Sequence, residues 1–313
     1  MLSYLLRRSL AAVPVLLLVS LLSFGIIWLV PGDPTAAFVD ASASPEQLAR
    51  LRHELGLDES LPSQMLHWYG RILTGDLGQS ILLRRSVFAA LVERLPVTLS
   101  LAGLALVLAV LLGVVAGIVA AMRRGTRADQ AVMTLALMGL SMPDFWLGLV
   151  LIVTFAVGLG WLPSGGFVPM SESVSGWLAS MAMPALTLAL VQMGFIARMT
   201  RSAMLDVLHQ DFVRTADAKG LSHGFVVLRH ALPNAMMPIL TVIGIIAGSL
   251  LGGAVVVEQV FSLPGVGRLI IGAIMSRDFP VIQGGLLFLA LIYLAVNLGV
   301  DLLYAAIDPR VRL

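Results

Sequence analysis

Four polar side chains stand inside long apolar runs of the sequence, where they could touch a polar solute. They are Ser141, Asp144, Gln192 and Asn297. A hydroxyl, a carboxylate and two amides can hydrogen-bond such a solute, and a charged residue at bilayer depth is by default a sign of a solute or ion pathway. The alternative is that each residue lies at a helix end or pairs with a neighbouring helix. Both interpretations stay open for Asp144, and also for Asp301, one turn beyond Asn297.

Composition places these runs in a lipid bilayer. The 313 residues are 58% hydrophobic and 12% charged, whereas about 25% of residues are charged in an average soluble domain. A helix needs about 20 apolar residues to cross the hydrocarbon core. We therefore predict an all-α integral membrane protein with an uncleaved first helix. The six predicted spans are 9–31, 97–121, 131–159, 180–200, 235–257 and 283–305, the third broken near Met142–Pro143 and the fourth starting close to Pro184.

No motif in the sequence supplies catalysis or metal binding. It contains no G-x-x-x-x-G-K-[ST], no H-E-x-x-H and no G-x-S-x-G. It has no cysteine, which excludes thiolate metal sites and a cysteine nucleophile. We predict no catalytic residue, no metal-binding residue and no P-loop ATP site in this chain. Intramembrane carboxylates are few and the two halves show no repeat, which disfavours an ion-coupled secondary transporter.

The distribution of basic residues predicts the orientation in the membrane. The short loops 160–179 and 258–282 contain only two basic residues, Arg268 and Arg277, so these loops are expected outside. Both termini are then cytoplasmic. The basic residues expected inside are Arg7, Arg8, Arg123, Arg124, Arg127, Arg198, Arg201, Arg214, Lys219, Arg229, Arg310 and Arg312.

The long segment 32–95 is predicted to form a small external helical segment. In "SPEQLARLRHELGL", Ser44 suits an N-cap and Pro45 the first helical position. "LPSQMLHWYGRIL" predicts a second short helix that ends near Gly75. Glycines at a spacing of four predict close helix packing in two spans: Gly113 and Gly117 in the second, and Gly244, Gly248 and Gly252, which favour it more strongly, in the fifth.

A polar, punctuated stretch from Leu205 to Pro233 separates two apolar runs and contains the only lysine, Lys219. Its pattern predicts an amphipathic helix ended by Gly220 and a second one that Ser222 caps and Pro233 closes. The predicted apolar stripes are Leu205, Leu208, Phe212 and Ala216, followed by Phe225, Leu228 and Leu232. This connection is long for two spanning helices. We interpret it as a docking element for another protein rather than as a solvated loop.

The same stretch resembles the cytoplasmic coupling motif of ABC importer permeases, E-A-A-x-x-x-G-x(9)-I-x-L-P. Ala216, Gly220, Leu232 and Pro233 match the motif, whereas Arg214 stands at the glutamate, Thr215 at the first alanine and His230 at the isoleucine. Further stretches resemble the first permease subunit of dipeptide, oligopeptide and nickel importers. They are "PGDP" at 31–34, "LGLD" at 55–58, "GDLGQS" at 75–80, "SMPDFWLG" at 141–148, "EQVFSLPGVGRL" at 258–269, "RDFPVIQ" at 277–283 and "DLLYAAIDPR" at 301–310.

The resemblance implies a type I ABC importer permease fold in a bacterial inner membrane. It implies three parts: a first transmembrane helix over 1–31, an external helical segment over 32–95, and a core of five spans over 96–313 with a coupling hairpin at 201–234. Its partners would be a second, related permease, two ABC ATPases that bind ATP and Mg²⁺, and an external solute-binding protein. The implied coupling residues are Arg214, Thr215, Ala216, Asp217, Lys219, Gly220, Leu221, Leu232 and Pro233.

Peptides are the expected substrate, with nickel chelates or glutathione as alternatives within the same family. The chain itself is expected to be a transport subunit without enzymatic activity or cofactors. A secondary transporter and a membrane-embedded enzyme remain the alternatives from other classes.

Overall fold

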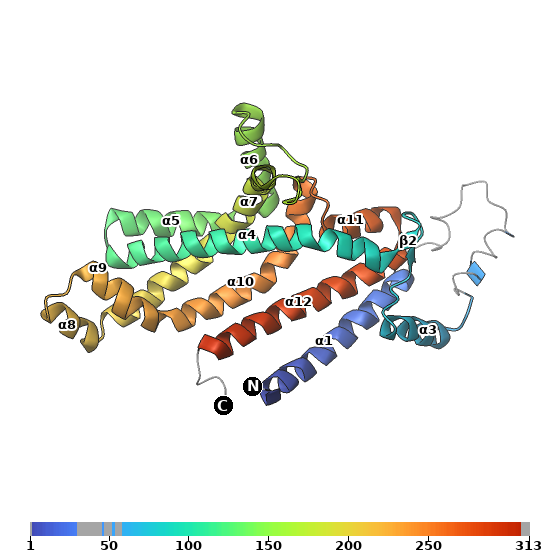
Figure 1. Cartoon of the computed structure of the whole chain (residues 1–313), viewed down its shortest axis with the longest axis horizontal. Helices are drawn as coiled ribbons and strands as arrows, with labels where there is room; N and C mark the ends of the chain where they lie inside the picture. Colours follow the sequence, from blue (N-terminus) through green and yellow to red (C-terminus); the bar gives the residue numbers. More distant parts are fainter. Residues whose placement is uncertain (1, 30–45, 47–51, 54–57, 308–313) are drawn as a thin grey trace. The chain divides into compact units, whose positions relative to one another are not determined.

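The computed structural model describes residues 2–29, 46, 52–53 and 58–307. These residues are almost entirely helical (Figure 1). The longer helices are α1 (Leu2–Leu29), α3 (Leu61–Leu73), α4 (Val87–Met122), α5 (Arg127–Ser141), α7 (Val174–Leu208), α10 (Leu232–Val260), α11 (Val266–Ser276) and α12 (Phe279–Ile307). Shorter elements are β1 (Gln79–Ser80), β2 (Arg85–Ser86), α6 (Asp144–Leu151), η2 (Ile152–Gly158), α8 (Asp211–Ala218), α9 (His223–Val226) and η3 (Val227–Ala231).

The described helices agree with the predicted spans. Five are long and apolar enough to cross a membrane, and there are six if the pair 127–141 and 144–158, bent by 107°, is one span. The predicted break at Met142–Pro143 is confirmed, because α5 ends at Ser141 and Pro143 precedes α6. The predicted start of the fourth span near Pro184 is wrong. Helix α7 begins at Val174, where the Ser173 hydroxyl accepts a hydrogen bond from Gly176 N, and Pro184 lies inside the helix.

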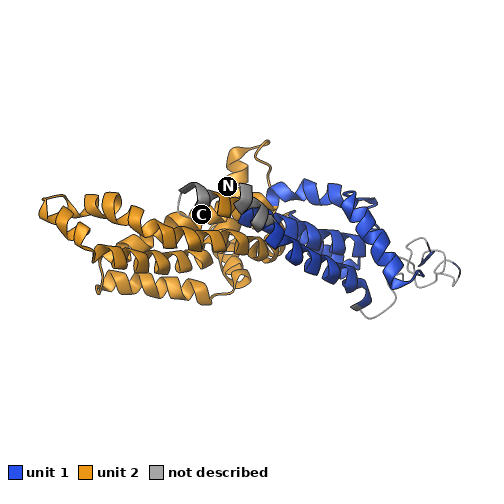
Figure 2. Cartoon of the chain, turned by 90° about the horizontal axis from the view of Figure 1, so that it is seen from below, with its two compact units in different colours: residues 1–97, 264–298, 312 blue, residues 98–263, 299–311, 313 orange. Residues whose placement is uncertain are grey.

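The chain divides into two compact units (Figure 2). Unit 1 comprises residues 1–97 and 264–298, and unit 2 comprises residues 98–263 and 299–311. Helix α4 runs without interruption through residues 95 and 96, where the external segment was predicted to end.

Unit 1 has an apolar core where the start of α4 packs with α11 and the start of α12. The antiparallel pair β1 and β2 is tied to this core by the buried Asp278, whose Oδ2 accepts hydrogen bonds from the Ser80 hydroxyl and from Leu82 N. Helix α3 is confirmed, and Gly75 follows it at a φ of +82°. The helix predicted to start at Ser44 lies outside the described residues, apart from a few isolated positions.

Unit 2 is held together by close approaches of α7 to its neighbours. A Cβ on Gly117 of α4 would lie 2.5 Å from Thr200 Cβ, and one on Gly113 would lie 2.7 Å from Ile196 Cβ. A Cβ on Gly139 of α5 would lie 2.8 Å from the Leu190 carbonyl oxygen. The glycine packing predicted for the second span is therefore confirmed. In the fifth span the prediction is wrong for Gly252, beside which a Cβ would meet nothing within 4 Å among the described residues.

Candidate functional site

The predicted docking element is a short helix and a turn leading into a long helix. Helix α7 ends at Leu208, residues His209 and Gln210 break the chain direction, and α8 follows. Gly220 then turns the chain at a φ of +81°, and a Cβ there would meet nothing within 4 Å. The glycine is therefore required by the backbone conformation and not by close packing. We call residues 211–228 the hairpin.

The apolar stripe predicted for the first helix is confirmed at Leu205, Leu208 and Ala216 and is wrong at Phe212. The break at His209–Gln210 interrupts the helical periodicity, so Phe212 is exposed while α8 buries Val213 and Ala216. Together with Val226 they form a small core against Leu208. Phe212 is 39% exposed, and in the second half Phe225 and Leu228 are 50% and 61% exposed. The hairpin thus has an apolar interior and a second, exposed set of large apolar side chains: Phe212, Leu221, Phe225 and Leu228.

Pro233 does not close the second helix, contrary to the prediction. It lies in the first turn of α10, where its missing N–H is tolerated, and the π-helical turn η3 precedes it. Residues 223–260 therefore form one continuous helical run, so the hairpin is directly joined to a spanning helix. Leu232 packs on the buried cluster that includes Met204, Val207 and Val227. The remaining predicted coupling residues, Arg214, Thr215, Asp217, Lys219 and Leu221, are exposed.

The four polar residues in the spans are not gathered into one cluster of contacts. Ser141 donates its hydroxyl to the Leu137 carbonyl at 3.0 Å, as a helix-terminal serine does. Asp144 begins α6 half-buried, and its Oδ2 would be 3.4 Å from a Cβ on Gly253 of α10. Gln192 is half-buried on α7. No hydrogen bond joins these three within the described part of unit 2, and Asn297, on α12, belongs to unit 1.

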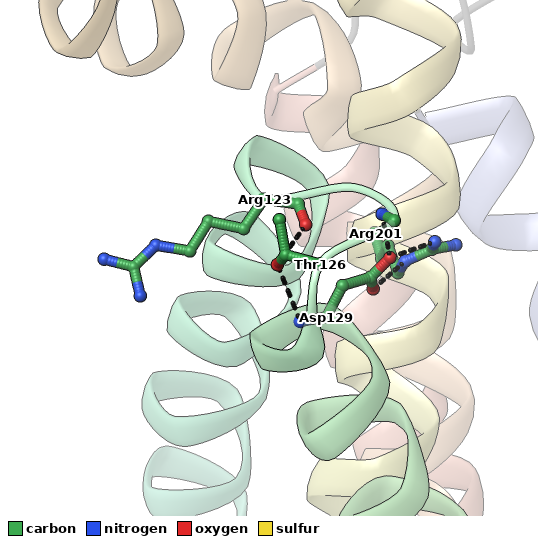
Figure 3. A network of polar contacts seen from close by, with 5 residues as sticks. Arg123, Thr126, Asp129 and Arg201 are labelled. Atoms are coloured by element: carbon green, nitrogen blue, oxygen red, sulfur yellow. Dashed lines mark hydrogen bonds and ion pairs between the residues drawn. The ribbon is translucent and has the colours of Figure 1, made fainter.

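A charged pair that the sequence interpretation missed lies at the hairpin end of unit 2. Arg201 Nε and Nη2 donate to Asp129 Oδ1 and Oδ2 at 2.6 and 2.7 Å (Figure 3). Gly125 N also donates to Asp129 Oδ2 at 3.0 Å, and Thr126 caps α5. The exposed fractions of the Asp129 and Arg201 side chains are 6% and 27%. An acidic residue in the first turn of a spanning helix, just after several arginines, was the available signal.

The sequence interpretation also missed a buried contact near the C-terminal end of α10. Thr98 Oγ1 donates to Glu258 Oε1 at 2.6 Å, and Glu258 is fully buried. It is the first residue of the "EQVFSLPGVGRL" stretch, so Glu258 has a structural function in unit 2.

Two family models together match nearly the whole chain. Residues 113–313 match the model described as "Binding-protein-dependent transport system inner membrane component". Residues 1–102 match the N-terminal model for membrane components of the same systems. The chain belongs to this permease family.

Full-length relatives agree with this assignment. The permease is 48% identical over 312 residues to a protein of Brucella abortus (strain 2308) that is named as a peptide transport system permease. It is 42% identical over 333 residues to the di/tripeptide transport system permease protein DppB of Pseudomonas aeruginosa. It is 43% identical over 312 residues to the glutathione transport system permease protein GsiC of Salmonella choleraesuis. In each case 100% of this chain and 99% of the relative are covered.

Solved structures support the fold. A chain of the inward-facing MetNI methionine ABC transporter superposes with a TM-score of 0.56 at 17% identity, covering 70% of the permease and 96% of that chain. The permease is thus a multi-pass inner-membrane subunit of a binding-protein-dependent ABC transporter. It is a transport component and not an enzyme, and the ATPase is a separate subunit.

Proposed function

We propose that this permease imports peptides and that the hairpin couples it to the ATPase subunits. The observation that carries the proposal is the exposed apolar set Phe212, Leu221, Phe225 and Leu228 on a turn fixed by Gly220. All four lie on the hairpin, where exposed large apolar side chains support an interaction site. Because the hairpin continues into α10 and follows α7, a push on it reaches two spanning helices directly.

The complete transporter would contain this permease, a second related permease, two ATPases that bind ATP and Mg²⁺, and a solute-binding protein. Each permease would present one hairpin to one ATPase. The residues proposed to contact the ATPase or shape the hairpin are Arg214, Thr215, Ala216, Asp217, Lys219, Gly220, Leu221, Leu232 and Pro233. ATP-driven closure of the ATPases would move the hairpins together and open the pathway outward. Both termini would be cytoplasmic, on the hairpin side.

The substrate pathway would include Ser141, Asp144, Gln192 and Asn297. The half-buried Asp144 is the main candidate, because its carboxylate packs close to the backbone of α10 at Gly253, where a Cβ would lie 3.4 Å from Oδ2. The external segment 32–95 would receive the binding protein. The division into a first helix over 1–31, this segment, and a core over 96–313 would follow that function.

Peptides are favoured because relatives at 42–48% identity are named for peptide or di/tripeptide transport. Glutathione is the second candidate because a 43% identical relative is named for it, and glutathione is itself a tripeptide with one unusual linkage. Nickel chelates remain a third candidate within the family. Mass spectrometry of the ligand retained by the cognate binding protein separates the three. A bound nickel complex without peptide would overturn the peptide proposal.

The coupling function is tested with the full transporter in liposomes, with Gly220→Val and Gly220→Asn compared side by side. Valine at a positive φ is strongly disfavoured, whereas asparagine adopts this conformation readily. We expect Gly220→Val to lose most ATP-dependent uptake while Gly220→Asn keeps it. Equal uptake and equal ATP hydrolysis in both variants would contradict the proposal.

Docking is tested by copurification of the ATPase subunits with Leu228→Glu. The control is Leu66→Glu, which places the same charge at another exposed leucine, on α3 of the external segment. The ATPases should be lost from Leu228→Glu and retained by Leu66→Glu. If the ATPases copurify with both variants, the exposed apolar set is not part of the docking surface.

A further inference from the structure

The turn between α4 and α5 is attached to the end of α7 at two points. Asp129 holds Arg201 by two hydrogen bonds at 2.6 and 2.7 Å. Arg124 Nη1 lies 3.2 Å from His209 Nε2. We call Arg124, Asp129, Arg201 and His209 the turn latch. Three of them, Arg124, Arg201 and His209, line an open polar pocket of about 440 Å³ together with Ser202, Leu205 and Asp206.

The two attachment points span the last turns of α7 and reach its end. Arg201 lies eight residues before His209, so the points are about two helical turns apart. His209 follows Leu208, the last residue of α7, and directly precedes the break that leads into α8. The latch therefore contacts α7 at the end of the helix that leads into the hairpin.

The geometry of the Asp129–Arg201 pair makes it a stiff connection. Two parallel charge-assisted hydrogen bonds fix the orientation of the guanidinium as well as its distance. The Asp129 carboxylate is further held by Gly125 N at 3.0 Å, and Thr126 Oγ1 accepts from Asp129 N while donating to the Arg123 carbonyl (Figure 3). The carboxylate thus ties the turn to α7 and orders the turn itself.

The Arg124–His209 contact has a defined direction. A guanidinium can only donate, so His209 Nε2 accepts. The hydrogen of the neutral ring is then on Nδ1, which faces the Leu205 carbonyl at 2.5 Å. This contact is exposed and single, so it contributes less than the Asp129–Arg201 pair.

Close helix packing adds further attachment of α4 and α5 to α7. Gly113 and Gly117 bring α4 against α7, and Gly139 brings α5 against α7. With their connecting turn also fastened to α7, α4 is held to it at Gly113 and Gly117 and α5 near both of its ends, at Asp129 and Gly139. A push that the hairpin delivers to α7 must then move α4 and α5 as well.

We propose that the turn latch is a second coupling element, in which Asp129 and Arg201 are positioning residues that make α4 and α5 move with the hairpin. The proposal rests on the coupling function of the hairpin. In this proposal the latch acts through α7 and needs no contact with the ATPase or the substrate. Its loss should leave ATP hydrolysis in place and reduce the transport obtained from each ATP.

The first test compares Asp129→Asn and Arg201→Gln with Arg198→Gln in the full transporter reconstituted in liposomes. Arg198 is the matched control because it is one turn away on α7, is exposed and stacks on the Phe195 ring at 5.3 Å. We expect both latch variants to lower uptake per ATP hydrolysed by about tenfold, the effect of losing one charge-assisted interaction. Arg198→Gln should leave the ratio unchanged. A parallel fall of uptake and hydrolysis in the latch variants would show a merely structural pair and overturn the proposal.

The second test uses the absence of cysteine from the chain. Asp129→Cys and Arg201→Cys are combined, and the two thiols are joined by a short bifunctional methanethiosulfonate after thiols of the partner subunits are blocked. Uptake per ATP should be low in the reduced double variant, return on cross-linking, and fall again with reductant. No return on confirmed cross-linking would overturn the proposal, since a covalent link replaces the mechanical function of the pair.

The two proposals fail in different ways. If Gly220→Val remains coupled, the hairpin proposal fails and the latch loses its basis. If Gly220→Val is uncoupled but the cysteine pair and Asp129→Asn transport normally, the hairpin proposal stands and only the latch is wrong.

Discussion

Asp129 in unit 2 and Asp278 in unit 1 both connect segments far apart in sequence, by different chemistry. Asp129 meets an arginine 72 residues away, and that arginine keeps 27% of its side chain exposed. Asp278 meets the Ser80 hydroxyl 198 residues away and Leu82 N, both neutral donors, and is itself 2% exposed. The carboxylate of Asp278 also has one buried oxygen, Oδ1, that accepts no hydrogen bond within the described structure.

This difference separates a connection that depends on charge from one that depends on burial. An ion pair with one exposed partner can release that partner to water when it breaks. The Ser80 hydroxyl and the Asp278 carboxylate are both buried, so loss of one leaves the other without its partner. The Asp278 connection therefore attaches the β1–β2 pair through burial, whereas the Asp129 connection holds the turn between α4 and α5 to α7 through charge.

The largest effect is expected for Asp278→Ala. It strands the Leu82 N–H and removes the partner of the Ser80 hydroxyl, at a cost of about 3 kcal/mol in the free energy of unfolding. SDS titration of the purified permease measures the change. Asp76→Ala serves as the control because Asp76 and its partner Arg71 are both more than half exposed. A cost for Asp278→Ala no larger than that for Asp76→Ala would remove the distinction between the two connections.

A smaller effect is expected for Asp129→Ala, at about 2 kcal/mol. The Arg201 guanidinium can turn partly toward water, which limits the loss. The double variant Asp129→Ala/Arg201→Ala should cost less than the sum of the two single variants, because each single variant already breaks the pair. Strict additivity in the same titration would mean that the two residues do not interact in the folded permease.

The smallest effect is expected for Asp278→Asn, at about 1 kcal/mol or less. The asparagine carbonyl still accepts from neutral donors, whereas at residue 129 the same change removes the charge that binds Arg201. Asp129→Asn should therefore destabilise the permease more than Asp278→Asn, although alanine gives the opposite order. The same order for both substitutions would contradict the assignment of one connection to charge and the other to burial.

Local sequence signals predicted the spanning helices, but they did not predict every break and boundary between helices. The spans followed from apolar length, and the turn at Gly220 followed from a glycine after a helical pattern. Periodicity assumes an uninterrupted helix, so the break at His209–Gln210 put the predicted stripe on Phe212 instead of Val213. Pro184 and Pro233 were interpreted as boundaries, but long helices accommodate both.

The connections themselves could not be predicted in this way. Asp129 and Arg201 each look like ordinary polar residues near a helix end, and only the packing of α5 on α7 brings them together. The same limit applies to the pathway candidates. Their polarity within apolar runs was visible in the sequence. Which of Ser141, Asp144 and Gln192 share a surface depends on the bend between α5 and α6, which the sequence does not give.

The contact between Gly117 and Thr200 has an evolutionary consequence. A Cβ at residue 117 would lie 2.5 Å from the Thr200 Cβ and 2.6 Å from the Ala197 carbonyl oxygen, which is backbone and cannot be trimmed by mutation. Enlargement at residue 117 therefore cannot be compensated at residue 200 alone. Across relatives we expect residue 117 to stay glycine while the side chain at residue 200 drifts in size, a one-sided pattern of variation rather than a paired one.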